Sequence, residues 1–262
     1  MAAPILTSVD GRVLSPEDAT ISVADEGFVR GDGVFEMLRL YKGEPFAWDE
    51  HLDRLERSAA GVELPIDRDL VEREAQALLE AGGDHDGCLR IMLTRGGSRV
   101  LMLEPPVVHP ATVTAATITF APSVVLAGVK SLSYGANEQA TRAASAKGAG
   151  EAVLVRPDGV VLEAPTSSIF WAADGGGLLT PSLELGILDS ITRGLLVGEL
   201  QVEEGTWPEE ELHGAHEAFL ASTTREVQPI ASINGRELPA VPGPRTREAA
   251  EAYVKLTGFA PV

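Results

Sequence analysis

Lys130 stands where a lysine could do covalent chemistry. Only four of the 21 basic residues are lysines, and Lys42, Lys147 and Lys255 lie in a glycine turn, near a helix end and on a charged helix. Lys130 instead follows a β-rich apolar run. An amine can lose its proton and form a Schiff base, whereas a guanidinium cannot. The local sequence fits equally well a lysine that runs along a strand end and reaches water.

A carboxylate and two hydroxyl-rich segments could serve a cofactor held by Lys130. Glu163 ends an apolar stretch, and opposite a pyridine nitrogen it would keep that nitrogen protonated. Ser190 opens a helix whose first backbone N–H groups could bind an anion, and residues 222–224 supply further hydroxyls. Taken alone, the same residues fit a solvent-exposed turn carboxylate and ordinary capping.

Composition limits the classes of function. The net charge of −18 argues against binding to nucleic acid or to anionic lipid. The single cysteine, Cys88, cannot form an intramolecular disulfide and lies in an apolar run, which predicts a core residue and a reducing cytoplasm. Residues 1–5 do not resemble a leader, no apolar run reaches about 18 residues, and the histidines lack zinc-site spacing.

The elements that would position these residues form two groups. In the first half, alternation and capping signals predict strands at 5–8, 33–41, 89–94 and 113–120, and helices after Asp49 and Asp67. In the second half they predict helices at 130–148, from 190 and at 246–256, and strands at 152–155, 160–162, 168–172, 217–220 and 227–233. Because there is no regular βαβ rhythm, we expect an α+β fold. Its expected domains are 1–119 and 129–262, joined by a linker at 120–128.

Several sequence blocks together resemble a known family. They occur in order along the chain: Gly-Asp-Gly-Val-Phe-Glu at 31–36, His-Leu-Asp-Arg-Leu at 51–55, Val-Lys-Ser-Leu-Ser-Tyr at 129–134, Leu-Glu at 162–163, Gly-Ile-Leu at 186–188, Ile-Thr-Arg at 191–193 and Ser-Thr-Thr-Arg-Glu-Val-Gln-Pro at 222–229. The chain resembles the class IV aminotransferases, the fold-type IV pyridoxal 5′-phosphate (PLP) enzymes. These include D-amino-acid and branched-chain aminotransferases and aminodeoxychorismate lyase.

The resemblance implies a role for each matching residue. Lys130 would form the internal aldimine and move the proton, Glu163 would pair with the pyridine nitrogen, and Arg54 would bind the phosphate. Tyr134 lies near where some members place a tyrosine and others a leucine. The other implied cofactor contacts are Ser167, Ser168, Ile191, Thr192, Ser222 and Thr223. The resemblance also implies two α+β domains with the cofactor between them, in a homodimer that borrows an active-site loop.

Substrate recognition departs from the family pattern. D-amino-acid members follow Thr-Arg-Gly with an Arg-x-His pair that grips the substrate carboxylate, and here Arg99 matches the arginine while Leu101 replaces the histidine. Arg30 could supply the missing contact, or it could be a surface residue paired with Asp25 or Asp32. Phe35, in the Gly-Asp-Gly block, completes the expected substrate-binding set.

The leading interpretation is a PLP-dependent transaminase that passes an amino group from a D-amino acid to a 2-oxo acid. An incomplete carboxylate trap would also admit (R)-amines. The alternatives are aminodeoxychorismate lyase, which forms 4-aminobenzoate and pyruvate, then a branched-chain L-amino-acid aminotransferase. A non-catalytic vitamin B6 binding protein would not need Lys130 and Glu163 together.

Overall fold

The computed structural model describes residues 3–259, and contacts divide the chain into two units. Unit 1 comprises the chain up to Val107 together with Val129–Tyr134, and unit 2 comprises Val108–Gly128 and the chain from Gly135 onward. Met1 and Ala2, part of the segment used to argue against a leader, lie outside the described residues. Within residues 3–259, no helix is long and apolar enough to cross a membrane.

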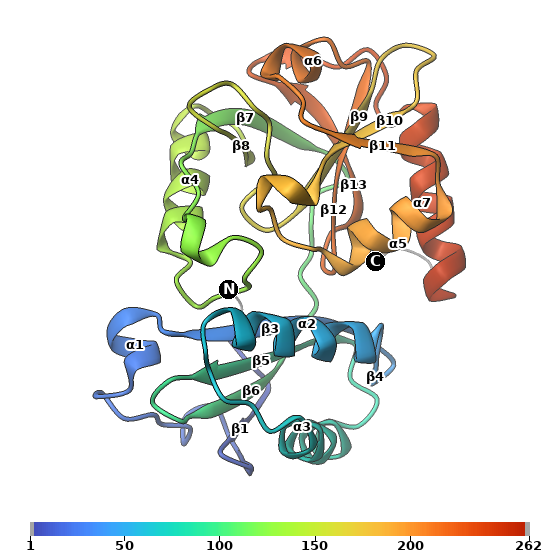
Figure 1. Ribbon diagram of the computed structural model, residues 1–262. Coiled ribbons are helices and arrows are strands. Elements are labelled where there is room, and N and C mark those ends of the chain that lie inside the picture. Colours follow the sequence, from blue (N-terminus) through green and yellow to red (C-terminus); the bar gives the residue numbers. More distant parts are fainter. Residues whose placement is uncertain (1–2, 260–262) are drawn as a thin grey trace. The chain divides into compact units, whose positions relative to one another are not determined.

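Unit 1 is an antiparallel six-stranded sheet with three helices (Figure 1). The strand order is β2-β1-β6-β5-β3-β4. The strands are β1 Leu6–Val9, β2 Arg12–Leu14, β3 Gly33–Tyr41, β4 Glu44–Pro45, β5 Gly87–Thr94 and β6 Arg99–Glu104, and the helices are α1 Glu26–Arg30, α2 Trp48–Gly61 and α3 Arg68–Gly82.

The core of unit 1 lies between α2, α3 and one face of the sheet. Val34 and Leu38 of β3 pack in one buried cluster with Leu52 and Leu55 of α2. Successive strand side chains alternate between faces, so Phe35 lies on the opposite face. The expected start of the second helix at Asp67 is confirmed, and the Asp67 side chain caps α3 by accepting a hydrogen bond from the backbone of Leu70.

The expected cap of α2 is wrong. The helix begins at Trp48, after Ala47 in the left-handed conformation, which places Asp49 inside the first turn. Its carboxylate there still favours the helix start through the helix dipole.

Unit 2 contains the second sheet, of eight strands, in the order β11-β10-β9-β12-β13-β7-β8 with β14 beside β13. The strands are β7 Val113–Thr119, β8 Glu151–Val155, β9 Ser168–Ala172, β10 Leu178–Pro181, β11 Val202–Gly205, β12 Glu217–Ser222, β13 Glu226–Ile233 and β14 Arg236–Glu237. The α-helices are α4 Gly135–Ala146, α5 Ile191–Glu199, α6 Glu209–His213 and α7 Pro244–Thr257, and the 3-10 turns are η1 Val124–Leu126 and η2 Leu183–Leu185. Helix α4 packs on β7 and β8, whereas α5 and α7 pack on β12 (Figure 1).

The division of the chain differs from the expected domains at both ends of the linker. Strand β7 pairs in parallel with β8 and β13, and these contacts place it in unit 2. Residues 129–134 instead add to unit 1, because Leu132 donates its backbone N–H to Gly33 O and Ser131 forms a bridge with Val34. The expected helix at 130 therefore begins only at Gly135.

Candidate active site

The backbone of Lys130 is fixed by two elements of unit 1. Its N–H donates to Ser58 Oγ on α2 at 3.2 Å, and its carbonyl accepts from the backbone N–H of Phe35 on β3 at 3.0 Å. Lys130 is half-buried, whereas Lys42, Lys147 and Lys255 are exposed. The structure therefore gives Lys130 surroundings different from those of the other three lysines.

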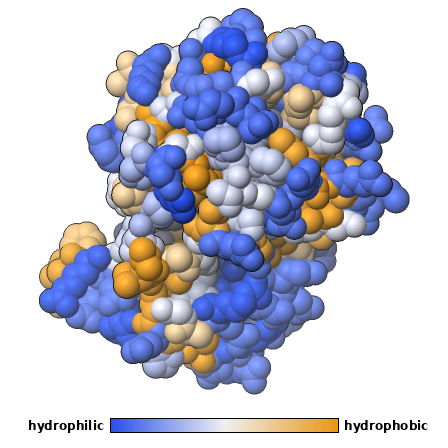
Figure 2. Space-filling view, turned by 45° about the horizontal axis from the view of Figure 1, so that its top comes forward, coloured by the Kyte–Doolittle hydropathy of each residue, from blue (hydrophilic) through white to orange (hydrophobic). Residues whose placement is uncertain are grey.

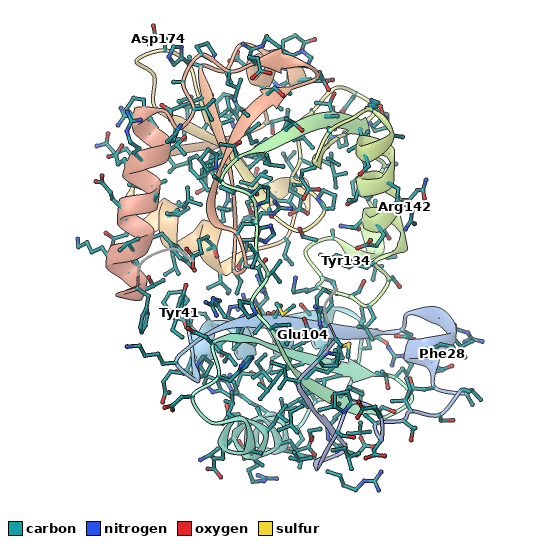
Figure 3. The ribbon with its side chains drawn as sticks, turned by 180° about the vertical axis from the view of Figure 1, so that it is seen from behind. Phe28, Tyr41, Glu104, Tyr134, Arg142 and Asp174 are labelled. Atoms are coloured by element: carbon teal, nitrogen blue, oxygen red, sulfur yellow. The ribbon has the colours of Figure 1, made fainter. Side chains whose placement is uncertain are left out.

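Two aromatic rings lie beside the Lys130 amine. Its Nζ is 4.4 Å from the ring centroid of Phe35 and 6.0 Å from that of Tyr134. The two rings meet edge to face with centroids 5.2 Å apart. Tyr134 lies in the loop before α4 (Figure 3). The faces of both rings attract a cationic amine, so they restrain where Nζ can go.

Arg54 lies in a buried network with Glu36 and His51. Its guanidinium donates from Nε to Oε1 of Glu36 at 2.7 Å and from Nη2 to Oε2 at 2.8 Å. Nδ1 of His51 lies 2.7 Å from the same Oε2. Glu36 is 0% exposed and Arg54 is 4% exposed. The carboxylate thus engages one whole edge of the guanidinium and fixes its plane.

The ionisation of this network follows from its geometry. Burial alone would raise the pKa of Glu36, but the charge and hydrogen bonds of Arg54, with the hydrogen bond from His51, lower that pKa to about 2. Burial lowers the pKa of His51 below 6.5 and outweighs the opposite effect of Glu36. Near pH 7 Glu36 is therefore ionised and His51 is neutral. Because a carboxylate can only accept, Nδ1 of His51 carries the donated proton.

In unit 2, the Glu163 carboxylate is held by backbone. Its Oε1 and Oε2 lie 3.2 and 3.3 Å from the backbone N of Leu188, which donates to them. Its own carbonyl accepts from the N–H of Leu154 on β8. The expected strand at 160–162 is not formed, and Val160 and Val161 make only isolated bridges. Glu163 is half-buried, so it keeps access to a polar partner.

The hydroxyl groups of unit 2 suit a phosphorylated ligand. Ser167 and Ser168 are 5% and 2% exposed, and within the described chain neither hydroxyl has a hydrogen-bond partner. A buried hydroxyl without a partner is costly and calls for a ligand or water. Ser190 caps α5 by accepting from the backbone of Arg193, and the first turn of this helix carries no acidic residue.

The remaining expected phosphate contacts lie at two segment ends. Ile191 and Thr192 begin α5, and Ser222 ends β12, with Thr223 following it. Thr192 and Ser222 are buried, whereas Ile191 and Thr223 are half-buried. Backbone N–H groups at the start of a helix and side-chain hydroxyls are groups that bind phosphate, so these residues fit the phosphate of PLP.

The expected substrate-binding arginines already have partners. Arg99 binds Glu74 of α3 through Nε and Nη2, at 2.8–3.0 Å. Arg99 pairs with Leu93, a residue of the helix-facing core, so it lies on the opposite face of the sheet from Phe35. Its role with substrate stays a prediction, and it would require release from Glu74.

Arg30 has a more open position. It ends α1, and its side chain is 71% exposed and pairs with Glu26 one turn earlier. Asp25, which the sequence offered as a partner, instead accepts hydrogen bonds from Gly27 N, Thr94 Oγ1 and Ser98 Oγ. An exposed i,i+4 pair is weak, so Arg30 can exchange Glu26 for another anion at little cost.

Comparison with known proteins decides the family. The family model for amino-transferase class IV matches residues 33–233. The chain belongs to the class IV aminotransferases. It is therefore a PLP-dependent transaminase of fold type IV, as the sequence resemblance predicted.

Relatives of this aminotransferase have different activities. The chain is 30% identical to D-alanine aminotransferase of Bacillus licheniformis, with 93% of this chain and 94% of the relative covered. It is 29% identical to aminodeoxychorismate lyase of Bacillus subtilis, with 86% and 85% covered. These relatives share the family but differ in the reaction that their names give.

Solved structures agree with this family. A hypothetical aminotransferase from Mycobacterium tuberculosis in a PLP-bound form has a TM-score of 0.86 at 27% identity, covering 96% of this chain and 98% of that one. A branched-chain aminotransferase from Thermoproteus uzoniensis with norvaline has a TM-score of 0.86 at 28% identity, covering 97% and 95%.

Sequence reasoning gave no role to three side chains of the network around Lys130 and Arg54. They are Glu36, His51 and Ser58. The spacing of His51, Arg54 and Ser58 at i, i+3 and i+7 places them on one face of α2, among its buried leucines. The sequence signal that could have identified these residues is the presence of polar side chains on the apolar face of a helix, together with a glutamate in an apolar strand.

Proposed function

We propose that this aminotransferase acts on D-amino acids, and also on (R)-amines, with a 2-oxo acid as the amino acceptor. The inclusion of (R)-amines rests on one observation, which is that the pair of residues expected to bind the substrate carboxylate is incomplete. Leu101 is 0% exposed in the core of unit 1, and Arg99 is bound to Glu74. A substrate without a carboxylate then loses little binding, because few groups are placed to grip one.

Similarity to D-alanine aminotransferase supports the choice of D-amino acids. The M. tuberculosis neighbour was also solved with alpha-ketoglutarate and PMP, which supports a 2-oxo acid as the acceptor. These likenesses favour transamination over the other activities within the family.

We assign the cofactor roles as follows. When bound, PLP supplies an aldehyde that carries the amino group and a ring that withdraws electrons from the substrate Cα. Lys130 would hold the cofactor covalently through Nζ and move the proton at Cα, and Phe35 and Tyr134 would restrict that amine. Glu163, held by Leu188, would keep the pyridine nitrogen protonated. The phosphate would be bound by Arg54, the start of α5 and the hydroxyls of residues 167–168 and 222–223.

The lyase is the second candidate. Its support is the 29% identity to aminodeoxychorismate lyase over most of both chains. Its substrate brings two carboxylates, which this chain would have to meet with arginines already paired to Glu26 and Glu74. Branched-chain L-amino-acid transamination ranks third, supported by the T. uzoniensis neighbour.

We also propose that the protein is a cytoplasmic homodimer. An apolar surface on unit 1 supports pairing, because Val23, Phe28 and Val29 are 81%, 69% and 58% exposed. Figure 3 shows Phe28 projecting from α1, and Figure 2 shows apolar groups gathered in patches among hydrophilic ones. A reducing compartment fits Cys88, because burial raises the pKa of its thiol to about 11 and keeps it protonated.

One panel separates these activities. The PLP-loaded protein is incubated with 2-oxoglutarate or pyruvate and, in turn, D-alanine, D-glutamate, L-leucine and (R)-1-phenylethylamine, while a separate reaction with aminodeoxychorismate is monitored for 4-aminobenzoate. We expect turnover of the D-amino acids and the (R)-amine. Fast turnover of L-leucine alone, or formation of 4-aminobenzoate, would replace the proposal with the corresponding alternative.

A further inference from the structure

Arg54 is held in place by Glu36 and His51, which are more deeply buried than Arg54 itself. Glu36 is 0% exposed and His51 is 1% exposed, and both face Arg54 from within the layer between β3 and α2. Two hydrogen bonds to one carboxylate restrict both the position and the rotation of the guanidinium plane. Nδ1–H of His51 in turn holds the Glu36 carboxylate.

We propose that Glu36 is the positioning residue for phosphate recognition by Arg54, with His51 holding Glu36 in place. The inference rests on the proposed role of Arg54 as a phosphate ligand. Glu36 contributes no contact with the cofactor. It sets the affinity by keeping the guanidinium in one orientation before the phosphate arrives, so that binding does not have to order a flexible arginine.

A carboxylate beside an arginine also has an opposing effect. It cancels much of the positive charge that attracts a phosphate dianion, so removing it could strengthen binding. The burial of Arg54 decides between the two effects. Without Glu36, a guanidinium that is 4% exposed loses its main partner and must reorient toward other acceptors or water. We therefore expect loss of Glu36 to weaken phosphate recognition. Weaker binding would show that Glu36 acts by orienting Arg54, whereas stronger binding would show that it acts by cancelling the charge of Arg54.

The test uses apoprotein and two probes that cannot react with Lys130, 4-deoxypyridoxine 5′-phosphate and 4-deoxypyridoxine. Equilibrium dialysis gives the ratio of their dissociation constants, which reports the phosphate contact alone. We expect Glu36→Gln to reduce the preference for the phosphorylated probe about tenfold, and Arg54→Ala to reduce it at least as much. His51→Leu should give a smaller loss, and His51→Asn, which keeps a donor near Nδ1, should restore most of it.

A matched control comes from the same sheet. Glu104 also binds an arginine through both oxygens, at 2.6 and 3.1 Å from Arg90, and is 7% exposed. Glu104→Gln removes another buried carboxylate that binds an arginine and should leave the probe ratio unchanged. If Glu36→Gln does not fold, Glu36→Asp serves instead, because the shorter carboxylate keeps the charge but cannot reach both nitrogens in the same geometry, and a partial loss is expected.

The outcomes distinguish a failure of the phosphate role of Arg54 from a failure of the positioning role of Glu36. If the wild-type protein shows no preference for the phosphorylated probe, or if Arg54→Ala keeps that preference, the proposed role of Arg54 fails. If Arg54→Ala loses the preference while Glu36→Gln and Glu36→Asp keep or increase it, the role of Arg54 stands and the positioning role of Glu36 is overturned. A parallel loss in Glu104→Gln would also overturn it, because the effect would then be a general consequence of removing a buried carboxylate.

Discussion

At the scale of single residues, Lys130 carries the covalent chemistry in our proposal. Lys130→Ala should abolish the covalent adduct that borohydride reduction forms with the cofactor, because Lys130 is half-buried beside Phe35 and Tyr134, whereas the other three lysines are exposed. Intact-protein mass spectrometry after reduction measures the adduct, and Lys147→Ala provides the control. An adduct that persisted in Lys130→Ala would refute the assignment.

Glu163 should matter for turnover more than for binding. Glu163→Gln keeps the size of the side chain but removes the charge that would hold the ring nitrogen protonated, so we expect proton removal from the substrate to slow by about 100-fold. PLP affinity should change much less. Stopped-flow measurement of single turnovers, beside a PLP titration, checks both. Wild-type rates would show that another group serves the ring.

We expect alanine substitution of the two candidate substrate arginines, Arg30 and Arg99, to have different effects. Arg30 is exposed and weakly paired, so Arg30→Ala should raise KM for a D-amino acid about tenfold and leave (R)-amine turnover nearly unchanged. Arg99 faces α3, so Arg99→Ala should lower the stability of unit 1 more than it changes KM. Steady-state kinetics with both substrates and thermal unfolding distinguish these cases, and equal losses with both substrates would contradict the role of Arg30.

At the scale of elements, the contact between β3 and α2 predicts a dependence of stability on pH. The folded-state pKa of Glu36 is about 2, below its usual 4.5, so the unfolded chain binds the proton more readily. The stabilisation is present above about pH 4.5 and is lost as pH falls toward 2. The difference between the two pKa values corresponds to a contribution of roughly 3 kcal/mol to the free energy of unfolding. Urea unfolding from pH 6 to pH 3 should therefore show the destabilisation by Glu36→Gln shrinking as pH falls. A constant difference would show that Glu36 does not titrate as this contact requires.

Sequence reasoning found elements with strong local signals and missed those defined by distant partners. The period-two pattern and the following glycine turn gave β3 with its observed bounds. Strand β6 was missed, although its alternation is buried between β1 and β5, and β11 was missed because Val202–Gly205 carries two glutamates and relies on pairing with β10. Residues 160–162 look like a strand but make only isolated bridges.

Sequence reasoning named the side chains that we propose to contact PLP, but not the residues that hold them in place. A lysine among apolar residues and the family blocks pointed to the side chains that would touch PLP. Ser58 could not be linked to Lys130 from the sequence, because the two are 72 residues apart and meet only once α2 packs on β3. Likewise, the pairing of Arg99 with Glu74 depends on how α3 lies across the sheet.

At the scale of the whole molecule, the proposed homodimer can be tested through α1. Phe28→Asp places a charge in the exposed apolar patch and should shift the protein from dimer toward monomer, because burying an unpaired carboxylate opposes association. Sedimentation velocity over a range of concentrations measures the shift. Arg142→Ala, at an exposed residue of α4 in unit 2, is the control. A wild-type mass of one chain would end the dimer proposal, and an unchanged dimer in Phe28→Asp would exclude this patch.

The path of the chain through its two units has a consequence for biosynthesis. The residues that close the free edge of β3, at 129–134, are translated after β7 and the rest of Val108–Gly128, which belong to unit 2. A nascent chain that has emerged only to Val107 therefore carries the helices and strands of unit 1 but leaves the N–H of Phe35 without the carbonyl of Lys130. The first unit to emerge from the ribosome is thus completed by the segment that contains Lys130, so a truncated product cannot form the finished sheet without also containing this lysine.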